Sequence, residues 1–332
     1  MPILKYASFF LLLGVGQPLT AATPQGALPT PPGQHEAAPA LRTLQDADER
    51  VARISYRLLV KGAELCPLKQ AISGFSIHHI TQYRKKDQAA AAVSFGLGRH
   101  PIVLTVAEGS AAERVGLQPG DAILAVNGAE TQTLFESRTE HSYAGVQKFE
   151  AMLEEAMAQG PVELRYGRDK EQRVVALEPE YGCQSRVQVV PTRALRGRAD
   201  GVYVQVSTGL VDFARDDDSL ALWIAHEIAH NILEHRKHLN GVPRGLLGMV
   251  GKNAARIRAT ELEADYVALY MMALAGYDIS KTPEFWRKLG KRSGGWLSSS
   301  PTHPSWGARS QRAEETIAEI VAKQARGERL LP

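Results

Sequence analysis

Two histidines and a glutamate within five residues could bind a metal ion and use it for hydrolysis. His226 and His230 lie four residues apart in the segment HEIAH, with Glu227 between them. Residues four apart share one face of a helix, so both imidazoles can bind one zinc ion at about 2.0 to 2.1 Å. Glu227 would then reach a water on the metal and act as a general base. The spacing predicts a hydrolytic zinc site.

The residues around HEIAH favour a bound metal over a solvated helix face. The pentapeptide alone can arise by chance, but here it lies in the apolar segment LALWIAHEIAHNIL. Burying two imidazoles and a carboxylate without partners is costly, which favours the metal interpretation. We expect a helix over residues 217–238, because the acidic cluster at residues 216–218 suits the positive end of a helix dipole.

The segment ELEAD at residues 261–265 offers the third ligand that catalytic zinc normally requires. On a helix, Glu261 and Asp265 lie on one face, a turn apart. Glu261 could bind the metal, and Asp265 could accept the free ring N–H of a ligand histidine. A charged helix start is the alternative, and the presence of HEIAH is what favours the metal site.

The segment THPSWGAR at residues 302–309 carries two more candidates, His303 and Arg309. Pro304 limits His303 to an extended or turn conformation, which favours a loop reaching back over the cleft. His303 could donate a hydrogen bond to the developing oxyanion, or it could occupy the open zinc position and keep the enzyme inactive. Arg309 could anchor this loop through a carboxylate or contact the substrate carbonyl. An ordinary surface ion pair is the alternative for both.

These three motifs, in this order and spacing, resemble those of the gluzincin metallopeptidases that include the CAAX prenyl proteases and the HtpX-type proteases. The segment ADGVYVQVSTGL is similar to the strand and turn that precede the active helix in that family. The resemblance covers about residues 44–72 and 183–326. The membrane-spanning helices of several members have no counterpart here, so a prenylated or membrane-embedded substrate does not carry over.

The resemblance also implies a role for each matching residue. One zinc ion per chain would be bound by His226, His230 and Glu261. Glu227 would be the base, and Asp265 would accept a hydrogen bond from a ligand histidine. The ion would lower the pKa of a bound water to about 7, and Glu227 would pass its proton to the leaving amine.

Between about residues 90 and 180 the sequence favours short strands and turns, with short helices at Ser110 to Val115 and Gly145 to Ala158. The segments GLQPGD and VNG, set between strand-like runs, resemble a PDZ domain of the type found in bacterial exported proteases. By that resemblance, the segment SFGLG would receive a peptide carboxylate, so the candidate peptide-binding residues are Phe95, Gly96, Leu97 and Gly98. A purely structural β insertion is the alternative.

The predicted fold class is α+β, a mainly helical zincin-type metallopeptidase domain with a small sheet, interrupted by a small β-rich PDZ-like domain. A strand at Val202 to Val206 is expected to offer an exposed edge to a substrate backbone; an internal strand with both edges occupied is the alternative. The expected domains are a signal peptide at 1–22, a proline-rich linker at 23–43, an N-terminal helical part of the peptidase at 44–89, the PDZ-like domain at 90–180 and the zinc metallopeptidase domain at 181–332.

The first residues, MPILKYASFFLLLGVGQPLTAA, have the pattern of a cleavable export signal. The apolar run is shorter than the about 20 residues that a spanning helix needs, so no stable membrane span is expected after cleavage. An uncleaved anchor is the alternative. The two cysteines, Cys66 and Cys183, predict a disulfide in an exported chain, rather than two buried thiols. We therefore expect a periplasmic or secreted protein.

Charge and motifs together limit the function. The 39 basic and 36 acidic side chains leave a formal charge of +3, and no basic run is interleaved with aromatics, so nucleic acid is not expected as a partner. We predict a zinc endopeptidase for exported or envelope proteins, acting in protein quality control, with protein or peptide substrates and a peptide tail bound by the PDZ-like domain. The alternative is a PDZ-bearing chaperone or adaptor with a structural or degenerate metal site, against which the intact Glu227 argues. A zinc hydrolase for other substrates is less favoured, because of the peptide-binding insert.

Overall fold

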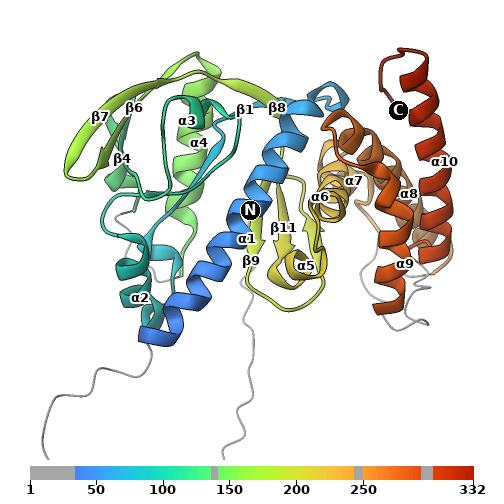
Figure 1. Cartoon of the computed structure of the whole chain (residues 1–332), viewed down its shortest axis with the longest axis horizontal. Helices are drawn as coiled ribbons and strands as arrows, with labels where there is room; N and C mark the ends of the chain where they lie inside the picture. The colour runs from blue at the N-terminus through green and yellow to red at the C-terminus, as the bar shows by residue number, and fades with distance from the viewer. Residues whose placement is uncertain (1–33, 136–140, 243–249, 293–301) are drawn as a thin grey trace, which may run out of the picture.

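The computed structural model describes residues 34–135, 141–242, 250–292 and 302–332. The expected signal peptide at 1–22 lies outside the described residues. Helices and strands form a β-rich unit and a mainly helical unit, which lie on either side of one long helix (Figure 1). The α+β prediction is therefore confirmed.

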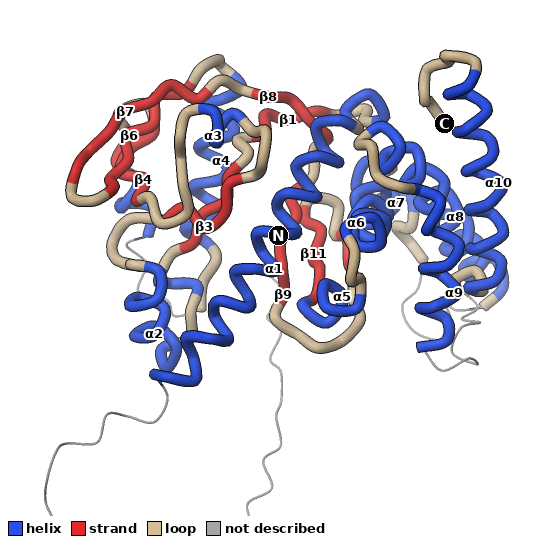
Figure 2. Tube along the Cα trace, in the orientation of Figure 1, coloured by secondary structure: helices blue, strands red, loops and turns tan. Residues whose placement is uncertain are grey.

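The helices and strands follow one another in a mixed order along the chain (Figure 2). The helices are α1 Gln34–Lys61, α2 Lys85–Phe95, α3 Ala111–Arg114, α4 Ala144–Ala158, α5 Thr208–Phe213, α6 Asp217–Ile232, α7 His235–His238, α8 Gly251–Leu274, α9 Thr282–Arg292 and α10 Trp306–Ala325. The strands are β1 Lys69–Ile72, β2 Phe75–His78, β3 Ile102–Val106, β4 Ala122–Val126, β5 Ala129–Glu130, β6 Val162–Arg168, β7 Glu171–Leu177, β8 Glu180–Cys183, β9 Arg186–Val190, β10 Gly197–Ala199 and β11 Tyr203–Ser207.

The β-rich unit is a six-stranded antiparallel sheet in the order β2-β3-β4-β6-β7, with β5 paired to β4. Helix α4 packs its apolar side on this sheet through Phe149, Leu153 and Met157. The unit starts at β2, so the expected boundary at residue 90 falls too late. The residues of β2, FSIH, do alternate between apolar and polar, but a run of four is the shortest that indicates a strand, and it was overlooked.

The helical unit has its own core, in which α6 and α8 pack against each other. A three-stranded sheet in the order β10-β11-β9 lies beside α6. Because β11 is the central strand, the expectation that residues 202–206 form an exposed edge is wrong. The edge nearer to α6 belongs to β10 instead.

Helix α1 joins the two units. It begins at Gln34 and contains Pro39, so residues 34–43 of the linker expected at 23–43 are helical, and the rest of that linker lies outside the described residues. Pro39 is the sixth residue of this helix, so it lacks the N–H that would donate to the carbonyl of residue 35. Further along, Arg50 binds the Asp217 carboxylate at 2.8 Å and the carbonyls of Val211 and Ala214, which fixes the start of α6 against α1.

The chain leaves and re-enters the helical unit through one paired junction. Strand β1 pairs antiparallel with β8, and Ile72 lies opposite Glu180. Cys66 and Cys183 form a disulfide with Cα atoms 5.3 Å apart, as the sequence predicts. Among the described helices, none combines the length and the apolar character needed to cross a membrane.

Candidate metal centre and peptide-binding groove

Helix α6 presents the HEIAH residues toward α8 because its start is capped and its apolar side is buried in the core. Asp216 caps its start by accepting a hydrogen bond from the Ser219 backbone N–H at 2.9 Å. Leu220, Ile224 and Ile228 are fully buried in the core of the helical unit. The remaining face carries His226 and His230, as the four-residue spacing predicts.

The predicted ligands lie together. The Nε2 atoms of His226 and His230 are 3.1 Å apart, and each lies 3.4 Å from a carboxylate oxygen of Glu261 on α8. Four ligands at about 2.0 to 2.1 Å in a tetrahedron leave neighbouring donor atoms about 3.3 Å apart. Two imidazole nitrogens and a carboxylate at these separations therefore fit a zinc ion.

Asp265 lies behind His226 in the predicted position. Its carboxylate is 2.9 Å from His226 Nδ1, so the ring N–H points to Asp265 and leaves Nε2 free for a metal. Burial alone would raise the pKa of Asp265, but the Arg309 guanidinium and the His226 hydrogen bond hold it below its usual value.

Arg309 takes only one of its two expected roles. It is 3% exposed, and its Nε donates to Asp265 at 2.7 Å. The idea that Arg309 touches the substrate carbonyl is therefore not supported by its position, because its nitrogens are directed at Asp265 and His226. It anchors the start of α10 to α8 and supports the residue that orients His226.

Glu227 lies at the same site in a closely packed setting. Burial raises its pKa to about 7, although the neighbouring His226 lowers it, and the Ala199 backbone in β10 hydrogen-bonds to it. A Cβ on Gly197 would lie 2.6 Å from Glu227 Oε1 and 2.0 Å from Trp223 Nε1. Only glycine lets β10 come this close to α6, a requirement that the sequence did not reveal.

His303 lies at the rim of the site. Its Nε2 is 3.6 Å from Glu261 Oε1, and the side chain is half-exposed. It does not belong to the compact set of donor atoms formed by His226, His230 and Glu261. The loop thus reaches back to the cleft as expected, with His303 beside the set of ligands and not within it.

His235 was not among the candidate site residues from the sequence, yet it is 1% exposed and touches the site. Its Nδ1 lies 2.8 Å from Nδ1 of His230. The available signal was the five-residue spacing after His230, but a continuous helix would have placed His235 on a different face.

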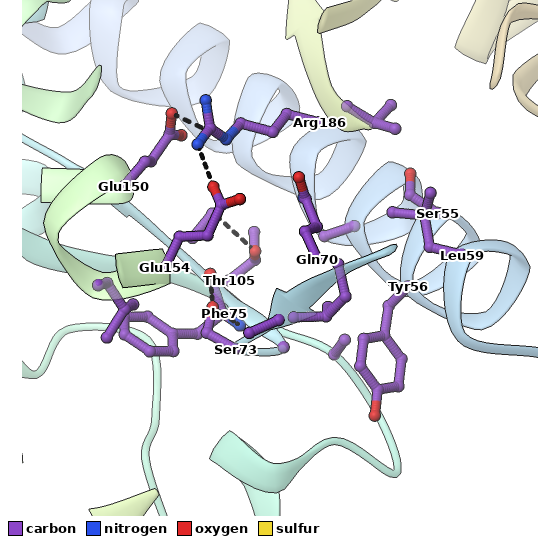
Figure 3. Close-up of a pocket in the computed structure, with 18 of the residues that line it drawn as sticks. Ser55, Tyr56, Leu59, Gln70, Ser73, Phe75, Thr105, Glu150, Glu154 and Arg186 are labelled. Carbon is purple, nitrogen blue, oxygen red and sulfur yellow. Dashed lines mark hydrogen bonds and ion pairs between the residues drawn. The ribbon is translucent and has the colours of Figure 1, made fainter. Parts of the chain in front are cut away.

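The β-rich unit has a cavity of about 170 Å³ between β2 and α4 (Figure 3). Phe75, Phe149 and Leu153 supply its apolar side, and the loop at Ser73 and Gly74 lies at its end. Strand β2 is an edge of the sheet and contributes Phe75, Ser76 and Ile77 to the lining. An edge strand beside a helix is the arrangement to which extended peptides add.

The four residues predicted to bind peptide lie elsewhere. Phe95 ends α2, Gly96 has a left-handed backbone with φ 65°, and Leu97 packs in a separate small apolar cluster. None of Phe95, Gly96, Leu97 and Gly98 lines the cavity. The sequence analysis placed this loop before β3, whereas the strand that borders the cavity beside α4 is β2.

The helical unit closes the other side of this cavity. Ser55, Tyr56 and Leu59 of α1 and Arg186 of β9 are among the lining residues (Figure 3). Arg186 forms ion pairs with Glu154 and, at 3.9 Å, with Glu150, both on α4. The cavity is smaller than the about 300 Å³ at which ligand pockets usually begin, so a peptide strand needs these walls to move.

Comparison with known proteins supports a metallopeptidase that carries a PDZ domain. The PDZ domain family matches residues 102–140. The mitochondrial metalloendopeptidase OMA1 of Arabidopsis thaliana is 32% identical over 127 residues, which are 32% of this chain and 26% of that protein. The same-named protein of Schizosaccharomyces pombe is 26% identical over 147 residues, which are 37% of this chain and 44% of that protein. The chain thus spans less than half the length of these relatives.

Proposed function

We propose that this protein is a zinc-dependent endopeptidase in which Glu227 is the general base. The observation that carries the proposal is the cluster of His226, His230 and Glu261. The two Nε2 atoms are 3.1 Å apart and lie 3.4 Å from Glu261 Oε2 and Oε1, respectively, and Glu227 is on the same helix as the histidines. The match to metalloendopeptidases supports a peptide bond as the target. The grouping with the CAAX prenyl and HtpX-type proteases is part of the proposal.

Each residue has a defined task in this mechanism. A zinc ion held by the three donors would polarise the scissile carbonyl and lower the pKa of a water to about 7. Glu227 takes the proton of the attacking water and returns it to the leaving amine. Asp265 keeps the His226 ring in the orientation that directs Nε2 at the donor set.

The substrate backbone has an edge strand to pair with beside Glu227. Strand β10 pairs only with β11 in the described sheet, and the Ala199 backbone lies against Glu227. An extended peptide added to β10 would gain main-chain hydrogen bonds and bring its carbonyl next to the donor set. We therefore assign to β10 the role that the sequence suggested for residues 202–206.

The β-rich unit is proposed to bind a peptide tail between β2 and α4. Support comes from the PDZ match and from the apolar cavity at that edge. The disulfide fits an oxidising compartment, so we propose a periplasmic or secreted protein that acts on exported or envelope proteins in quality control.

The test combines zinc analysis with digestion of an unfolded protein by the native chain and by Glu227→Gln. We expect stoichiometric zinc in both and cleavage by the native chain, with a loss of about 10²-fold or more in the variant because an amide cannot accept the water proton. Glu261→Gln should instead weaken zinc binding. A native chain that binds zinc but cleaves no unfolded protein would favour the chaperone or adaptor alternative.

A further inference from the structure

The helix that carries the HEIAH segment breaks immediately after it. Helix α6 ends at Ile232, and Glu234 has a left-handed backbone with φ 53°, which is uncommon for a residue other than glycine. In a continuous helix, His235 would lie about 140° around the axis from His230. The break changes the direction of the chain, so that His235, the first residue of α7, contacts the His230 ring.

His235 links His230 to an acidic side chain on α8. Its Nδ1 is 2.8 Å from His230 Nδ1, and its Nε2 is 3.3 Å from Glu263 Oε2. The His235 side chain is almost fully buried, whereas that of Glu263 is 56% exposed. The imidazole therefore fills a closed space between a candidate ligand and a carboxylate at the surface.

Only one proton arrangement suits both contacts when His230 offers Nε2 to a metal. The His230 proton is then on Nδ1, from which it donates to the unprotonated Nδ1 of His235. The His235 proton is on Nε2 and donates to the Glu263 carboxylate. Every polar hydrogen in this chain of three groups has an acceptor, and each ring is neutral.

The other ligand histidine is supported in a different way. His226 Nδ1 faces the Asp265 carboxylate at 2.9 Å, and Arg309 holds that carboxylate. For His230, among the described residues, His235 occupies the equivalent place beside Nδ1. Each candidate imidazole ligand thus has its own acceptor, a carboxylate for His226 and a neutral imidazole for His230.

We propose that His235 is a positioning residue for the metal centre, which fixes the tautomer and ring orientation of His230, with Glu263 holding His235 in turn. The proposal rests on the metal site of the proposed function. It assigns a purpose to the uncommon backbone of Glu234, since the contact requires the helix to break there.

The test measures zinc affinity of the full chain by competition with a chromophoric chelator, which needs no substrate. His235→Ala should weaken zinc binding about 10- to 100-fold, the usual effect of losing such a partner. His235→Asn should restore most of the affinity, because its amide oxygen can stand where Nδ1 stands. His238→Ala, an exposed histidine on the same short helix, is the matched control and should bind zinc as the native chain does.

Two further measurements separate positioning from packing. The visible spectrum of the cobalt-substituted chain should change in His235→Ala and return toward the native spectrum in His235→Asn. If His235→Ala fails to fold, Glu263→Ala at the exposed end provides a milder test, and it should also lower zinc affinity.

The outcomes separate this proposal from the proposed function. Native zinc affinity in His235→Ala or, where that variant does not fold, in Glu263→Ala overturns the positioning role alone. Equal losses in the Ala and Asn variants, with equal thermal stability of the zinc-free chains, do the same. A native chain that binds no zinc overturns the proposed function, and this inference falls with it.

Discussion

The guanidinium of Arg309 lies over the indole of Trp286, with its central carbon 3.6 Å from the ring centroid. The same guanidinium donates to Asp265 through Nε at 2.7 Å and also through a terminal nitrogen. The residue is thus a buried clamp between α9, which carries Trp286, and α8, which carries Asp265. Without this cation, the buried Asp265 carboxylate would retain its hydrogen bond from His226 but no compensating charge.

Removing the Arg309 charge should therefore be costly. Arg309→Met leaves the Asp265 charge buried without its cation, so we expect the zinc-free chain to lose about 3 to 5 kcal/mol of unfolding free energy. Adding Asp265→Asn should recover part of that loss, because the amide removes the unpaired charge. Urea unfolding of the single and double variants measures both effects; equal stability of native chain and Arg309→Met would contradict the clamp.

Gly197→Ala should impair catalysis without removing the metal. The added methyl group would meet Trp223 and Glu227 at distances of 2.0 and 2.6 Å, so β10 or the base must shift. A displacement of about 1 Å can cost about 10²-fold in rate, and we expect a loss of that order with unchanged zinc content. Gly167→Ala, whose nearest contact would be 3.7 Å, is the control. Full activity in Gly197→Ala would show that Glu227 does not depend on this close approach.

His303→Ala distinguishes the two roles considered for His303. Because its nitrogen lies beside Glu261 and outside the compact donor set, we expect unchanged zinc binding and a lower kcat, by about 10² to 10³-fold if it donates to the oxyanion. Steady-state kinetics and zinc analysis are the measurements. Higher turnover would instead indicate that His303 blocks the open zinc position in the native chain. Unchanged turnover would indicate that His303 has no role in catalysis.

Asp48 on α1 should make the stability depend on pH. Burial, and then the charge of Glu49, raise its pKa to about 7 from 3.8. Between these values the folded chain retains a proton that the unfolded chain has lost, so the stability contribution falls as pH rises through this window. Asp48→Asn should raise Tm more at pH 8 than at pH 4.5. The exposed Asp46→Asn is the control, and a gain independent of pH would refute the prediction.

The insert should be removable at its paired junction. Ile72 lies opposite Glu180 at the end of the β1-β8 pair, so an Asn-Gly turn in place of residues 73–179 would close a two-residue hairpin. We expect zinc binding and cleavage of short unstructured peptides to persist, and processing of folded or tailed substrates to weaken. Comparing the two substrate classes is the measurement, and equal activity toward both would leave the insert a structural role only.

Sequence patterns located the candidate ligands because those patterns are local. His226, His230 and Glu261 lie on long helices whose spacing fixes which side chains share a face. The packing of α6 against α8 could not be predicted from one sequence. Glu261 was nevertheless found, because catalytic zinc requires a third protein ligand. The disulfide followed in the same way, from there being only two cysteines.

The errors share a different cause. The helix break at Glu234 and the short strand β2 depend on contacts with distant segments. No glycine or proline lies beside Glu234, and Gly74 marks the start of a strand of only four residues. Consequently His235 was not recognised as part of the site, and the peptide loop was assigned to residues 95–98. The edge role was given to residues 202–206 because pairing partners of a strand are not encoded in its own alternation.

The disulfide between Cys66 and Cys183 has few possible competing products when the chain is oxidised. The chain has two cysteines, so an oxidised monomer has one connectivity available and nothing to shuffle. The competing product is a disulfide between two chains. It forms when the Cys66 thiol reacts with another molecule before Cys183 of the same chain has been synthesised. Dilution, rather than a disulfide isomerase, is therefore the condition that favours the correct product.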